Sequence, residues 1–90
     1  MDDLEQFYRA ALPATIDALE TARRSLQAGD QAALESIRRI AHTLKGSGGT
    51  YGFHNISAAA ELLQHTGAEN ITQNLDNLIG ILREVASGGV

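Results

Sequence analysis

Apolar side chains recur every three or four residues in four successive segments of this chain, and this spacing is the strongest constraint on its fold. Such a spacing is typical of one face of an amphipathic α-helix. Turn-forming residues separate the segments, for example Gly29-Asp30 between the first two. Four amphipathic helices with short connections predict an all-α protein, an antiparallel four-helix bundle.

The first helix is expected from about residue 3 to residue 28. Pro13 lies inside it, where proline removes a backbone donor and crowds the preceding turn. We expect a kink rather than two helices, because the apolar stripe continues in phase across the proline. Gly29 is a suitable stop, and Asp30 a suitable N-cap for the next helix. The expected stripe consists of Leu4, Phe7, Tyr8, Ala11, Thr15, Leu19, Ala22 and Leu26.

The second helix, expected over about residues 30 to 50, carries a histidine on its outer side. At about 100° per residue, His42 falls roughly 130° from the centre of the core-facing stripe and therefore faces solvent. That stripe consists of Leu34, Ile37, Ala41, Leu44 and Gly48. The neighbours of His42 on the outer surface are cationic or small: Arg38, Arg39, Lys45, Gly46 and Gly49.

Four glycines, Gly46, Gly48, Gly49 and Gly52, follow the histidine closely. Each costs about 1 kcal/mol relative to alanine inside a helix. Such a cluster predicts a close approach of the backbone to another element or to a partner, with fraying near Gly48 as the alternative.

Two more helices are expected after this segment. The third begins with Asn55 as its N-cap and ends before Gly67, and the fourth begins with Asn70 as its N-cap. The tail from Ser87 onward should fray. The 90 residues (1–90) therefore form one small domain. The residues expected to be buried are Ile56, Ala59, Ala60, Leu62 and Leu63 in the third helix, and Ile71, Leu75, Leu78, Leu82 and Val85 in the fourth.

Composition narrows the classes of function. The absence of cysteine excludes disulfides and thiolate metal sites, and is consistent with a reducing compartment. No apolar run approaches the roughly 20 residues that cross a bilayer, and the acidic start argues against a signal peptide or membrane anchor. The net charge of −4 argues against nucleic-acid binding, which uses a basic face. We expect a monomeric cytoplasmic protein, and the starting methionine and compact ends favour a free-standing protein.

The segment His42-Thr43-Leu44-Lys45-Gly46, followed by small residues and Gly52, resembles the phospho-acceptor motif of histidine-phosphotransfer (HPt) domains of two-component phosphorelays. That family has the pattern His-x-Leu-Lys-Gly, and the resemblance covers most of the chain. The pair Gly48-Gly49 departs from it, because the family more often has Ala or Ser beside a single Gly. The resemblance implies a phosphotransfer protein that is not an enzyme and has no ATP site.

The resemblance also implies roles for the motif residues. His42 would accept the phosphoryl group on its outer ring nitrogen, Nε2, while a hydrogen bond holds the inner one. A solvent-exposed imidazole is mostly neutral and nucleophilic near pH 7. Lys45 lies beside it and can offset the charge of the phosphoryl group. A side chain at Gly46 would shade the imidazole and block an incoming active site. Gln64 or His65 of the third helix could approach His42.

No metal ligand set or strong general base adjoins His42 in the sequence, so no cofactor or metal of its own is expected. Mg²⁺ would come from the partner receiver domain. His54 and His65 are interpreted as cap-region and surface residues. A zinc site built from the three histidines would need a fourth ligand, and their spacing does not fit a short zinc-binding pattern. A hydrolase triad has no support, because no Asp adjoins the hydroxyl groups beside the histidine.

The surrounding positions have two interpretations each. Arg38 and Arg39 either attract an acidic partner pocket or simply keep the helix soluble, and Glu35 is placed to pair with Arg39. Gly49 permits either close packing or docking of a partner.

Three functions compete. The first is a phosphorelay intermediate that accepts a phosphoryl group from a receiver-domain aspartate of a hybrid kinase and passes it to a response regulator. The second is the phospho-acceptor domain of a chemotaxis-type histidine kinase. The third is a helical interaction module whose histidine is not phosphorylated. The dimerising region of sensor kinases fits less well, because an acidic residue usually follows its histidine and Thr43 stands here.

Overall fold

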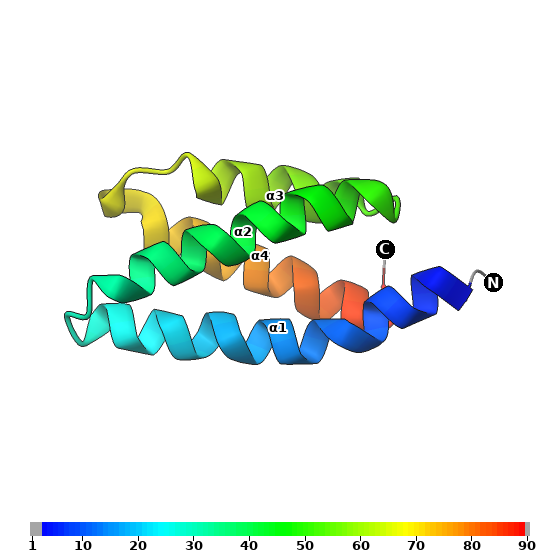
Figure 1. Ribbon diagram of the computed structural model, residues 1–90, viewed down its shortest axis with the longest axis horizontal. Helices are drawn as coiled ribbons and strands as arrows, with labels where there is room; N and C mark the ends of the chain where they lie inside the picture. Colours follow the sequence, from blue (N-terminus) through cyan, green and yellow to red (C-terminus); the bar gives the residue numbers. More distant parts are fainter. Residues whose placement is uncertain (1–2, 90) are drawn as a thin grey trace.

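Residues 3–89, which the computed structural model describes, form a bundle of four α-helices (Figure 1). Neighbouring helices in the sequence run antiparallel, and no strand occurs within this range. The predicted all-α four-helix bundle is therefore confirmed. A short 3₁₀-helix, η1, precedes the last helix. The elements are α1 (Asp3–Gln27), α2 (Ala32–Thr50), α3 (His54–Gln64), η1 (Ala68–Asn70) and α4 (Ile71–Ala86).

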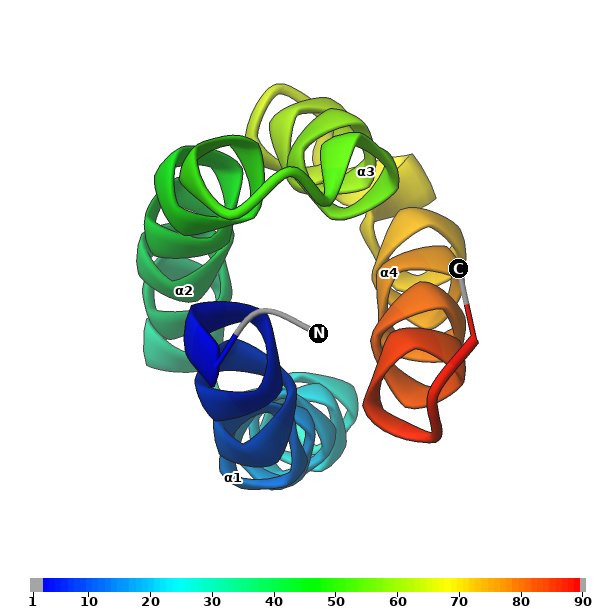
Figure 2. The same ribbon diagram turned by 90° about the vertical axis from the view of Figure 1, so that its right-hand side faces the viewer.

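The four helices follow one another around a common axis, and α4 closes the ring against α1 (Figure 2). Each helix turns one apolar stripe toward this axis. Because burying one aliphatic side chain contributes about 1.5–3 kcal/mol, these stripes hold the bundle together without disulfides. No helix within residues 3–89 is long and apolar enough to cross a membrane. The largest fully buried side chains are Leu12, Leu19, Ile37, Ile56, Leu63, Leu75, Leu78, Leu82 and Val85.

The predicted stripes of the last three helices are mostly confirmed. All five predicted positions of α4 are buried, and in α2 every predicted position is buried except Leu34, which is partly buried. In α3, Leu62 was predicted inside but is 54% exposed, while Leu63 is fully buried. Leu62 points about 100° away from Leu63, toward the outer side of α3.

The predicted stripe of α1 is partly wrong. Leu4 is 61% exposed and Phe7 is 70% exposed. Figure 1 shows the N-terminal turns of α1 projecting past the ends of the other helices. Phe7 also points about 100° away from Tyr8, which is buried and stacks on Tyr51 and Phe53. Farther along, Leu12 and Ile16 are buried in place of the predicted Ala11 and Thr15, because larger side chains remove more apolar area from water. The buried residues of α1 are Tyr8, Leu12, Ile16, Leu19 and Ala22.

The prediction of a single helix across Pro13 is confirmed, because α1 runs through it without a break. Figure 1 shows the N-terminal turns tilted from the direction of the rest of the helix. The expected stop is also confirmed: Gly29 has φ +96°, a conformation that favours glycine. The prediction of Asp30 as the N-cap of α2 is wrong by one residue, because the N-cap is Gln31. The Asp30 carboxylate still accepts a hydrogen bond from the Ala32 amide at 3.0 Å, just before the helix.

The starts of the last two helices differ slightly from expectation. Phe53, not Asn55, is the N-cap of α3, and the helix begins at His54. Asn70 is the N-cap of α4 as predicted, although its side chain makes no capping hydrogen bond.

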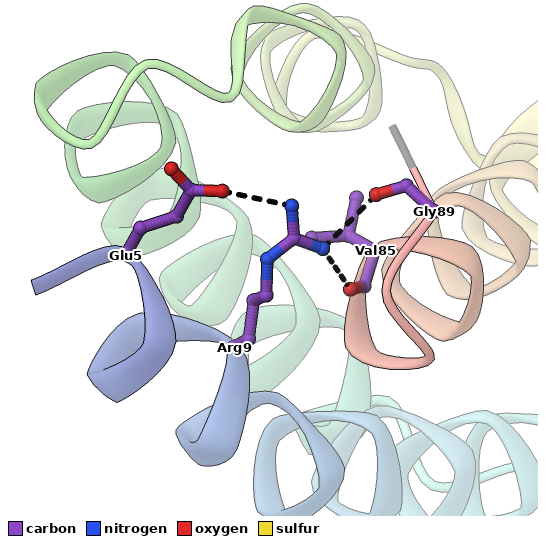
Figure 3. Close-up of polar contacts among 4 residues, drawn as sticks. All are labelled: Glu5, Arg9, Val85 and Gly89. Atoms are coloured by element: carbon purple, nitrogen blue, oxygen red, sulfur yellow. Dashed lines mark hydrogen bonds and ion pairs between the residues drawn. The ribbon is translucent and has the colours of Figure 1, made fainter. Parts of the chain in front are cut away.

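Arg9 ties the first helix to the end of the last one (Figure 3). Its Nη1 donates to the carbonyl oxygens of Val85 and Gly89, and its Nη2 donates to Glu5 at 2.9 Å. The guanidinium also lies over the ring of Phe53, 5.0 Å from its centre. A cation beside the last carbonyls of a helix satisfies acceptors that have no partner within the helix. This end of the bundle is therefore closed by a charged group.

The predicted fraying of the tail is wrong as far as Gly89, and Val90 lies outside the described residues. Gly88 has φ +94°, and its amide donates to the carbonyl of Val85 at 3.1 Å. The Gly89 amide donates to the carbonyl of Glu84 at 2.8 Å. These bonds form a glycine-based helix end of the Schellman type, which the contact with Arg9 reinforces.

Candidate functional site

His42 is exposed on the outer side of α2, as the sequence predicts. It follows Ala41, which is fully buried, and the helical rotation between them turns His42 away from the core. No leucine of the core therefore covers the ring. A histidine in this position is accessible to a second protein.

Gln64, the last residue of α3, holds the inner nitrogen of His42. Its Nε2 lies 3.0 Å from the Nδ1 of the ring. Because this bond occupies Nδ1, Nε2 is the nitrogen available to an incoming group. Of the two candidates that the sequence offered, Gln64 makes this contact, whereas His65 lies just beyond the end of α3 and is exposed.

A glutamine amide can form a hydrogen bond with either neutral tautomer of the imidazole. With its nitrogen toward His42, the amide donates and the ring proton lies on Nε2. When the amide turns by half a rotation, Oε1 accepts from Nδ1–H and the lone pair lies on Nε2. Only the second arrangement leaves a lone pair on Nε2.

Lys45 lies on the side of His42 that faces α3. Its Nζ lies 3.6 Å from Oε2 of Glu61, and its backbone carbonyl accepts a hydrogen bond of 2.8 Å from Ser57 Oγ. Lys45 thus follows His42 by three residues, and its ammonium pairs with a carboxylate on the neighbouring helix. Neither Glu61 nor Ser57 figured in the sequence predictions. With Gln64 they form a polar stripe at positions i, i+4 and i+7 of α3, a spacing that could have been recognised.

The glycines of the motif are in three different environments. No atom outside the local helix lies within 4 Å of the position that a β-carbon on Gly46 would occupy, and Gly46 is exposed. A β-carbon on Gly49 would lie 3.7 Å from Ser57 Oγ, an ordinary contact. A β-carbon on Gly48 would lie 3.1 Å from Ile56 Cγ2, and the helix continues to Thr50 without fraying. Packing thus accounts for Gly48 alone, and docking at Gly46 and Gly49 stays a prediction.

Arg38 contacts the end of α3. Its Nη2 donates to the carbonyl of Thr66 at 3.0 Å, and its Nε is buried without a hydrogen-bond partner. The Thr66 hydroxyl in turn donates to Leu62 and accepts from Asn74 Nδ2, both at 2.6 Å. Arg38 therefore helps to join α2 to the connection between α3 and α4. A docking role for it stays a prediction.

Arg39 lies on the opposite side of His42 from Lys45. It is exposed and lines a shallow groove of about 360 Å³ between α1 and α2, which extends to Thr43. The expected pair with Glu35 does not occur among the ion pairs of residues 3–89. Its charge is thus exposed at the edge of the site.

The other two histidines lie at the two ends of α3. His54 begins α3 and His65 follows its last residue, and both are exposed. No three His, Asp or Glu side chains in the described part of the chain are arranged to hold a metal ion.

Residues 3–88 match the family described as Hpt domain. Comparisons with curated proteins and with solved structures found no match. The family match spans nearly the whole chain and agrees with the four-helix fold described above. The chain therefore belongs to the Hpt domain family, the phosphotransfer modules of two-component systems, which lack a kinase site of their own.

Proposed function

We propose that this domain is a phosphorelay intermediate that carries a phosphoryl group on His42. The group would come from a receiver-domain aspartate and pass to the receiver domain of a response regulator. The observation that carries this proposal is the exposed imidazole, whose Nδ1 is held by Gln64 and whose Nε2 is accessible. Lys45 supplies a nearby cation, and Gly46 leaves one side of the ring without a neighbouring side chain.

The chemistry needs only a nucleophile from this chain. Nε2 of neutral His42 attacks the phosphorus of the aspartyl phosphate while the bond from phosphorus to the aspartate oxygen breaks. The carboxylate leaves with the electron pair, and the ring keeps its proton on Nδ1 and becomes positively charged. Oε1 of the reversed Gln64 amide accepts that proton's hydrogen bond. Onward transfer is the same step in reverse, with a second aspartate as the nucleophile.

The partner would supply what the helix lacks. In-line displacement at phosphorus is accelerated mainly by positioning and by cations that offset the charge on the oxygens. We assign Mg²⁺ and the in-line geometry to the receiver domain. The contribution of this domain is the positioned imidazole and the ammonium of Lys45.

The test is phosphoryl transfer from receiver domains loaded with acetyl phosphate. The parent protein should become labelled with an acid-labile, alkali-stable phosphoryl group, and His42→Gln should not. His54→Gln and His65→Gln are matched controls, because both histidines are exposed on the same molecule, and both variants should be labelled like the parent.

Other outcomes identify the competing functions. Labelling of His42→Gln would refute the assignment of the acceptor. Labelling of the parent directly by a histidine kinase with ATP, but by no receiver domain, would identify the acceptor domain of a chemotaxis-type kinase. An absence of label from every donor would favour an interaction module.

A further inference from the structure

Two side chains of α3 contact the imidazole and the ammonium that the proposed function uses on α2. Gln64 contacts the imidazole of His42, and Glu61, one turn earlier, pairs with Lys45. The side chains of Lys45 and Glu61 are 41% and 55% exposed, and the distance of 3.6 Å is long for a hydrogen bond. The pair is therefore loose and can separate at low cost.

Two contacts hold the backbones of α2 and α3 together beside this ion pair. Ser57 Oγ donates to the carbonyl of Lys45 at 2.8 Å, and Gly48, one turn later, permits close contact with Ile56 of α3. The two helices are thus fixed against each other at the level of Lys45. Movement of the ammonium needs only rotation of its side chain, with no displacement of the helices.

A phosphoryl group on His42 changes the charges around this lysine. It adds about two negative charges three residues before Lys45, on the same surface of α2. The ammonium is then shared between the phosphoryl oxygens and the Glu61 carboxylate. When it turns to the phosphoryl group, Glu61 loses its partner. The carboxylate thus favours the unphosphorylated protein over the phosphorylated one.

We propose that Glu61 is a positioning residue that holds Lys45 in the resting protein and thereby lowers the stability of phospho-His42. This inference rests on the proposed function of His42. The consequence is that transfer from His42 to the response regulator is favoured. A less stable phosphohistidine transfers its phosphoryl group more completely to an aspartate of that regulator.

The test measures the equilibrium partition of the phosphoryl group between this domain and a receiver domain. Glu61→Gln preserves the shape of the side chain and removes its charge. It should raise the equilibrium ratio of phosphorylated to unphosphorylated domain by about 1.4- to fivefold, the range expected for a partly exposed ion pair. Glu35→Gln is the matched control, because it removes an exposed carboxylate from the outer side of α2 that pairs with no described residue. This control should change the partition by clearly less.

A double-mutant cycle identifies the route through Lys45. In a Lys45→Met background, Glu61→Gln should have a clearly smaller effect, because no ammonium remains to be shared. Equal effects in both backgrounds, an equal effect of Glu35→Gln, or an unchanged partition would each overturn the inference. Failure to label His42 of the parent would instead refute the proposed function, and labelled parent with an unchanged partition would refute only the role of Glu61.

Discussion

Gly48 of α2 and Ile56 of α3 lie so close that a β-carbon on Gly48 would come within 3.1 Å of Ile56 Cγ2. The amide nitrogen of Ser57 would be equally near, at 3.1 Å. Ile56 is fully buried, and the Ser57 amide belongs to the backbone of the first turn of α3. The Ser57 amide cannot move without shifting the backbone of α3. The glycine therefore lies where α2 and α3 approach each other most tightly, one turn beyond Lys45.

Gly48→Ala should therefore destabilise the bundle, although alanine favours a helix. We expect a net loss of up to about 2 kcal/mol, because overpacking costs about 1–3 kcal/mol and the helical preference returns about 1 kcal/mol. Gly49→Ala is the matched control in the same turn, because its β-carbon would make only an ordinary contact of 3.7 Å with Ser57 Oγ. It should leave stability unchanged or improve it. Urea unfolding of both variants tests this, and equal stabilities would contradict the packing role of Gly48.

Gly46→Leu should stabilise the helix and weaken the docking of a receiver domain. The position is open within the molecule, so a leucine meets no clash and gains up to about 1 kcal/mol of helical preference. The same side chain stands one turn from His42 and obstructs a partner that approaches the ring. Gly80→Leu is the control, because Gly80 is equally open but lies on α4.

Calorimetric titration with a receiver domain that phosphorylates the parent would measure the difference. Both variants should unfold at or above the parent temperature, and only Gly46→Leu should bind and transfer more weakly. Unchanged affinity and unchanged transfer in Gly46→Leu would count against the steric argument.

Periodicity predicted the helices well because each buries one stripe, but it could not choose between neighbouring registers. In α1, Leu12 and Ile16 are buried where Ala11 and Thr15 were predicted, and both pairs have the same spacing. The volume of the side chains decides between them, together with how far the partner helices extend. The exposure of Phe7 reflects rotation along the helix, because Phe7 points about 100° away from Tyr8, which is buried.

The features of the site were likewise predicted only in part. Rotation along one helix was sufficient to predict that His42 faces solvent, because helical geometry alone determines it. The contacts with Gln64 and Glu61 depend on how α3 is placed against α2. That placement depends on Gly48, whose packing role becomes evident only once Ile56 is known to face it. Contacts between helices therefore required the structure.

Arg9→Met should destabilise the bundle and loosen the end of α4. The substitution keeps much of the apolar stem and removes the donors to Val85, Gly89 and Glu5. Hydrogen bonds to charged groups contribute about 1.5–3 kcal/mol, and we expect a loss near the lower figure because the group is partly exposed. Amide hydrogen exchange near Gly89 should accelerate. Arg24→Met, which removes an exposed arginine with one weak contact of 3.4 Å to Thr21, should change neither quantity.

Tyr8→Phe should be less stable than the parent at neutral pH, with a gap that narrows in alkali. Burial raises the pKa of the Tyr8 phenol above its ordinary value of 10.0, which the hydrogen bond with Ser47 partly counteracts and the nearby Tyr51 reinforces. A raised pKa in the folded state means that the protonated phenol is favoured by folding. This contribution is complete below the unfolded pKa and is lost as the pH rises toward the folded pKa.

At about pH 8 the variant lacks only the bond of 2.9 Å to Ser47, a loss of about 1 kcal/mol. At about pH 10.5 the phenol is largely ionised in the unfolded parent, whereas folding still favours the protonated form, so the parent loses stability. Phenylalanine does not titrate, so the variant does not lose this contribution. Denaturant unfolding at the two pH values measures the gap directly, and a gap of constant size would show that ionisation of Tyr8 is not coupled to folding.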